Sequence, residues 1–223
     1  MPRVKLPRKS TSVDMTAMCD VAFLLLSFFI LATKFKPPDK LEVTTPKSVS
    51  TKALAAKNVV LVTMDKEGKV YFSVSDENPD EKVEVLDLVG TLKGMTFTDQ
   101  EKAAFKRSAS FIGVPFAQLK GYLALSPDQA DKMKLPGIPV TDTLNNELTI
   151  WIRAAATAFQ GKTMALLVKG DNEAKFPSFK GIIDAFKKNE QYKFSMITDP
   201  EGVPPGTDLF RKNEATGGKA TDL

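Results

Sequence analysis

One carboxylate, Asp20, stands inside the most apolar stretch of the chain, which runs from Met15 to Thr33. Extended back to about Val13, the stretch is about 21 residues long, or roughly 31 Å at the rise of an α-helix, which is enough to cross the hydrocarbon core of a bilayer. Asp20 would then lie about 10 Å inside the membrane, where a carboxylate costs a few kcal/mol. We expect it to be functional, because a carboxyl group in a low-dielectric site can be neutral in one state and charged in another.

Two hydroxyl residues share a helix face with Asp20. Thr16 lies four residues before it and Ser27 lies seven after it, with Lys34 on the same line. A single helix cannot hide a polar stripe, so we expect the stripe to face another subunit or a wet path. The alternative is that each hydroxyl bonds its own helix backbone, which would leave only Asp20 to be explained.

The net charge of +4 lies wholly before the apolar stretch, since the basic residues after position 12 are matched by the 27 acids. The positive-inside rule therefore keeps residues 1–12, a basic arm, in the cytoplasm and places everything after Phe35 outside it. Nucleic acid is a poor partner for this arm, because the arm is short and leads straight into the apolar run.

A cleaved signal peptide is the competing interpretation of the same stretch. It is disfavoured because Asp14 and Asp20 crowd the start of the apolar core and because no clean Ala-x-Ala site precedes the polar chain. We therefore expect residues 13–35 to remain as a transmembrane helix.

The composition argues against an enzyme. The chain has no histidine, which removes histidine-based triads, histidine metal sites and the usual proton shuttle at neutral pH. Its single cysteine, Cys19, lies in the apolar stretch, so no disulfide can form within the outer part. Neither a nucleophile elbow nor a glycine-rich phosphate loop is present, and we expect no cofactor and no metal.

Outside the membrane the pattern predicts a linker and one α+β domain. Residues 36–57 are expected to be the linker, with a short strand at Leu41–Thr45 that ends at Pro46. The domain is expected at 58–199, and the tail at 200–223 is expected to be disordered because Pro, Gly, Lys, Thr and Asp dominate it. Apolar runs and periodicity predict strands at 59–64, 69–74, 164–169 and 192–198, and helices at 143–159 and 176–188.

The stretch from Asp14 to Lys34 resembles the span of the ExbD/TolR family of proton-channel subunits, through Asp-Met-Thr-Ala-Met-Cys-Asp-Val-Ala-Phe-Leu-Leu-Leu. The outer pieces are also similar to that family: the strand that ends at Pro46, the Asp-x-x-Gly hairpin within Met64–Phe72, and the closing strand–helix–strand at Lys169–Thr198. The middle segment of the chain, about residues 78–160, is far longer than the middle segment usual in that family. We expect it to be a helical insertion. Contact of this insertion with peptidoglycan or with a partner is left open.

The resemblance implies a fold and a mechanism. It implies a single N-terminal transmembrane helix followed by a small periplasmic α/β domain, with a mixed sheet and helices packed on it. Asp20 looks like the family's proton-carrying aspartate, with Thr16 and Ser27 as supporting polar contacts. Leu41, Val43 and Pro46 would belong to a strand that pairs with an effector.

The implied partners are an ExbB/TolQ-like multi-span protein, a second copy of this chain, and a TonB-like or Tol-like effector, in the bacterial inner membrane. The chain would transduce the proton motive force for TonB-dependent outer-membrane transport. Alternatives are a Tol-like subunit for envelope maintenance, a flagellar-stator-like subunit, which would need a large peptidoglycan-binding domain, and a cell-wall-binding module on an inert anchor. Asp20 argues against the inert anchor.

Overall fold

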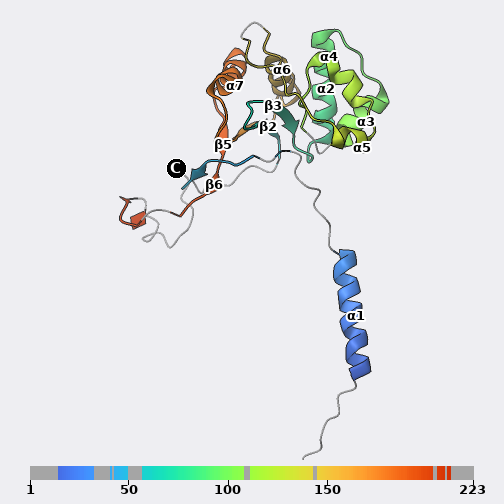
Figure 1. Cartoon of the computed structure of the whole chain (residues 1–223). Helices are drawn as coiled ribbons and strands as arrows, with labels where there is room; N and C mark the ends of the chain where they lie inside the picture. The colour runs from blue at the N-terminus through green and yellow to red at the C-terminus, as the bar shows by residue number, and fades with distance from the viewer. Residues whose placement is uncertain are drawn as a thin grey trace, which may run out of the picture. The chain divides into compact units, whose positions relative to one another are not determined.

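Contacts divide the chain into two units, Met1–Asp39 and Lys40–Leu223. The structure is a computed structural model of the whole chain (Figure 1). It describes residues 15–32, 41, 43–49, 57–107, 111–142, 145–202, 205–208 and 210–211.

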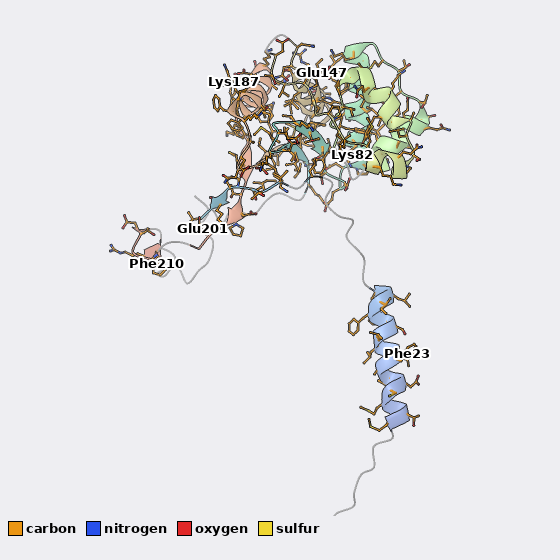
Figure 2. The ribbon with its side chains drawn as sticks, viewed as in Figure 1. Phe23, Lys82, Glu147, Lys187, Glu201 and Phe210 are labelled. Atoms are coloured by element: carbon orange, nitrogen blue, oxygen red, sulfur yellow. The ribbon has the colours of Figure 1, made fainter. Side chains whose placement is uncertain are left out.

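The first unit contains one described helix, α1 (Met15–Ala32), 18 residues long. Neither proline nor glycine interrupts it, and of the described helices it alone is long and apolar enough to cross a membrane. None of its side chains is buried, and they project from all sides of the helix (Figure 2). The span was expected at 13–35, and its outermost residues lie outside the described part.

The second unit is built on a four-stranded mixed sheet in the order β3-β2-β4-β5, as the resemblance implied. β2 (Val59–Met64) pairs antiparallel with β3 (Val70–Val74) and parallel with β4 (Ala165–Gly170). β4 pairs parallel with β5 (Ser195–Ile197). The last strand was expected at 192–198 and is shorter.

A glycine closes the hairpin between β2 and β3. Gly68 has a φ of +84°, and its N–H donates to the carbonyl oxygen of Asp65 over 3.0 Å. This backbone conformation is one that glycine adopts without steric cost, which explains the Asp-x-x-Gly pattern. The turn returns the chain in register, with Val62 opposite Phe72.

Within the described residues, six helices accompany the sheet. α7 (Phe176–Lys188) connects β4 to β5 and has the bounds that the sequence predicted. The helix predicted at 143–159 is α6, which begins later, and residues 143 and 144 lie outside the described part. The helices before β4 are α2 (Pro79–Lys93), α3 (Asp99–Arg107), α4 (Phe116–Leu123), α5 (Pro127–Lys132) and α6 (Leu148–Ala158).

The long middle of the chain, 78–160, shares the core of the sheet. The ring of Trp151 on α6 is fully buried, and its centroid lies 5.1 Å from that of Phe72 on β3. Isolated bridges join Ile112 and Ile138 to the edge of β3, at Phe72 and Val70. α2 also packs against α6 and α3 (Figure 1). The segment is therefore helical, as expected, and is an integral part of the second unit.

The strand expected at Leu41–Thr45 is not present there. Residues 43–46 have irregular backbone, and the strand follows them as β1 (Lys47–Ser48). β1 pairs parallel with β6 (Asp199–Pro200), which lies at the start of the tail that was expected to be disordered. Most of that tail lies outside the described residues. The predicted position was wrong because alternation of apolar and polar residues indicates a strand but does not show which segment it pairs with.

Candidate functional site

The polar face of α1 is the first candidate site. With 3.6 residues per turn, Thr16, Asp20 and Ser27 fall within about 40° of one another around the helix. Asp20 is exposed and lies roughly 8 Å from the first residue of α1. Within the described residues its carboxylate accepts no hydrogen bond and forms no ion pair. The face therefore presents one uncompensated carboxylate in an otherwise apolar helix.

The Ser27 hydroxyl donates a hydrogen bond over 2.8 Å to the carbonyl oxygen of Phe23, one turn earlier. This is the backbone bond that serine often makes in membrane helices. Ser27 is thus satisfied within its own helix, as the alternative interpretation expected. Asp20 has no such partner within α1.

The described residues contain no group of three or more carboxylate, cysteine or histidine side chains that could hold a metal ion. Cys19 is exposed and free. Of the three side chains on the polar face of α1, the Asp20 carboxyl group is the one that can readily exchange a proton.

Residues 43–46, the segment where an effector strand was expected, are bound to the chain's own domain. The N–H of Thr44 donates to Asp171 Oδ2 over 2.9 Å, and its carbonyl oxygen accepts from the N–H of Asn172 over 2.9 Å. The Thr45 side chain is buried. The carbonyl oxygen of Pro46 accepts from Asp199 N–H over 3.0 Å. We call this docked segment, residues 43–48, the tether.

Asp171 organises the domain end of the tether. Its carboxylate accepts the N–H groups of Glu173 and Thr44, and these two hydrogen bonds lower the pKa of Asp171 below its ordinary value. Asp171 was not singled out from the sequence. Its one signal was the Gly-Asp pair that ends the strand, since Asp in such a turn commonly caps backbone N–H groups.

A family model described as biopolymer transport protein ExbD/TolR matches residues 7–201. The chain belongs to the ExbD/TolR family. The match begins before α1 and ends after β6, so it spans both units. Comparisons with curated proteins and with solved structures give no significant match.

Membership in the ExbD/TolR family sets the general role. The family provides energising subunits for biopolymer transport, is not a family of enzymes, and works with ExbB/TolQ and with TonB or Tol partners. The long apolar helix α1 fits a single-pass membrane anchor in such a protein.

Proposed function

We propose that this chain is the proton-coupled subunit of an inner-membrane motor of the ExbB–ExbD type, which energises TonB-dependent outer-membrane transport. The observation that carries the proposal is Asp20, a lone carboxylate within an apolar helix. An exposed carboxylate on a membrane helix is costly unless a partner or a wet path covers it. The polar face of α1 thus supports a position inside a multi-span ExbB/TolQ-like partner, together with the same face of a second copy of this chain.

In this mechanism a proton arriving from the periplasm neutralises Asp20, and loss of the proton to the cytoplasm restores the charge. Movement of one elementary charge through 100 mV supplies about 2.3 kcal/mol. The charged form favours a polar surface of the partner and the neutral form tolerates an apolar one. Alternation between the two would rotate or rock α1 within the partner.

The orientation follows from the charges that flank α1. The basic arm, Arg3, Lys5, Arg8 and Lys9, stays in the cytoplasm, and the second unit lies in the periplasm. Motion of α1 would reach that unit through the chain before the tether. The effector would pair with the strand segment Leu41, Val43 and Pro46. On the edge that carries Thr44 it would displace the hydrogen bonds of Thr44 to Asp171 and Asn172.

The test of Asp20 is a comparison of three full-length variants in cells that lack the native gene. Asp20→Asn should abolish proton-dependent uptake while the protein still reaches the membrane and co-purifies with its multi-span partner. Asp20→Glu should keep a fraction of the activity because it retains the carboxyl group. Ser27→Ala should stay near the native level, since that hydroxyl is already bonded to Phe23. Full activity of Asp20→Asn would refute the proposal.

The family description names TolR beside ExbD, so a Tol-like role in envelope maintenance is the second candidate. Two measurements in the same cells, energised uptake and detergent sensitivity, distinguish the two roles. Loss of energised uptake with an intact envelope supports the ExbD-like role, and sensitivity to detergent with normal uptake supports the Tol-like role.

A further inference from the structure

A pocket with a volume of about 500 Å³ opens on the second unit, and no residue of the tether lines it. Three segments form most of it: the turn between β2 and β3 at 67–69, the segment 136–141, and the start of α7; Pro115 adds to the lining. The volume lies within the range of roughly 300–1,000 Å³ that is typical of ligand pockets. Its apolar lining consists of Pro115, Pro136, Ile138, Pro139, Val140 and Pro177.

Two glycines hold the three segments at this spacing. A Cβ atom on Gly68 would lie 2.7 Å from Ser178 Oγ, and a Cβ atom on Gly137 would lie 2.8 Å from the Cβ of Lys69. Both glycines have positive φ, at +84° and +92°, which disfavours any other residue. The close approach therefore fixes the walls of the pocket, and Gly68 leaves room beside Ser178.

Ser178 supplies an unused hydroxyl. Its side chain lines the pocket and the residue is only 8% exposed, yet its Oγ forms no hydrogen bond with any described residue. The hydroxyl is therefore available to a solvent or ligand group that enters the pocket. Ser178 also lies in the first turn of α7, whose 13 residues direct a partial positive charge toward this end. No side chain caps that terminus.

The charged residues of the lining leave one cation uncompensated. Lys69 Nζ lies 2.6 Å from Glu67 Oε2, so these two form a pair. Lys175 also lines the pocket, is exposed, and forms no ion pair or hydrogen bond through its ammonium group within the described part of the chain. The pKa of Glu67 is lowered first by the hydrogen bond from Lys69 and further by the charges of Lys69, Lys134 and Lys175. The pocket is therefore positive overall.

From the free Lys175 ammonium, the unpartnered Ser178 hydroxyl and the start of α7, we infer that this pocket binds a carboxylate of an acidic peptide segment of a partner protein. One uncompensated ammonium matches the single charge of a carboxylate better than the double charge of a phosphate. A carboxylate is also much smaller than the cavity, so the proline-rich walls call for a ligand with apolar atoms beside the charge. A peptide provides both, and proline walls bind it without ordering long side chains.

The test uses the full chain in lipid nanodiscs and a fluorescently labelled acidic probe, Ala-Pro-Glu-Asp-Val-Leu with a free carboxyl terminus. Fluorescence anisotropy gives its affinity, and Ala-Pro-Gln-Asn-Val-Leu-amide serves as the uncharged control. Lys175→Gln should weaken binding of the acidic probe at least tenfold, and Ser178→Ala should weaken it several-fold. Lys180→Gln, which removes an exposed charge from the same helix outside the pocket, is the matched control and should leave the affinity unchanged.

Lysine acetylation read by peptide mapping then locates the ligand. The acidic probe should slow modification of Lys175 at least threefold and leave that of Lys180 unchanged. Equal protection of both lysines would show nonspecific screening and would overturn the inference. Protection by succinate or phosphate with none by the peptide would also overturn it. An Asp20→Asn chain should bind the probe normally, so failure here is distinguishable from failure of the proposed motor function.

Discussion

Asp20 and Asp171 are two carboxylates that the chain uses in opposite ways. Asp171 accepts two backbone N–H groups and fixes the end of the tether. Asp20 has no such partner within the described residues and stands in an apolar helix. A carboxylate with fixed hydrogen bonds is held in its charged form, whereas one in apolar surroundings can change its charge at little structural cost. In the proposed mechanism Asp20 is the proton-coupled group, whereas Asp171 anchors the tether.

The anchoring role gives a pH prediction for the Thr44–Asp171 hydrogen bond. Because the pKa of Asp171 is lowered from its ordinary value of 3.8, the ionised carboxylate stabilises the docked tether above that value. The contribution should be lost as the pH falls below 3.8 and through the lower pKa of the folded protein. We expect the hydrogen-exchange protection factor of the Thr44 amide to decline over that range.

The same contact can be weakened at neutral pH by Asp171→Asn, because a neutral amide is a poorer acceptor than a carboxylate. We expect amide exchange of Thr44 and Glu173 to accelerate several-fold at pH 7. Asp184→Asn, a half-buried position on α7, is the control and should leave both amides protected. Unchanged exchange in Asp171→Asn would show that Asn172 and the burial of Thr45 hold the tether by themselves.

At the scale of elements, one cluster of aromatic rings joins the helices in the middle of the chain to the sheet. Trp151 on α6 has ring centroids of Phe72, Phe105 and Phe116 at 5.1, 6.3 and 5.6 Å. These rings come from β3, α3 and α4, so Trp151 joins the sheet to the helices that precede it. Loss of this side chain should disturb all of them at once.

Trp151→Ala should lower the free energy of unfolding by about 3–5 kcal/mol, as expected for removal of a large buried side chain. Trp151→Phe should cost less, because it also removes an indole N–H that has no partner among the described residues. Phe176→Ala, at a 72% exposed position, should change stability by no more than about 0.5 kcal/mol. Chemical denaturation followed by circular dichroism checks the three values.

The sequence predicts an element well when the local pattern of apolar residues determines it. It predicts an element poorly when contacts with distant parts of the chain determine it. The strands at 59–64 and 165–170 are apolar runs between turns, and α7 has clear helical periodicity, so all three were predictable. The start of α2 is not evident from the sequence, because its first turn looks like a polar loop. In the fold, Lys82 of that turn is buried and paired with Asp76, an arrangement that only the tertiary structure reveals.

The candidate sites divide in the same way. Asp20 was evident from the sequence, because one carboxylate interrupts a long apolar run. The pocket at Lys175 and Ser178 was not, because it needs three segments from distant parts of the chain to meet. The docking of Thr44 on Asp171 was also hidden, since 127 positions separate the two residues.

For the whole molecule, the proposed topology can be tested with single cysteines in a Cys19→Ala background. A cysteine at Lys120, exposed on α4, should react with a membrane-impermeant maleimide in cells with a permeabilised outer membrane. A cysteine at Arg8 should react only after the inner membrane is opened. The reverse pattern would place the domain in the cytoplasm and would contradict the proposed periplasmic site of action.

The parallel pairing of β1 with β6 has a mechanical consequence. Both strands begin at the same end, so tension that enters from the α1 side and is resisted through β5 would peel the tether away instead of shearing it. In peeling, the bonds from Asp199 to Pro46 and from Glu201 to Ser48 carry the load one after the other. The tether would yield at low force and release slack before the load reaches β2, the next strand along the chain.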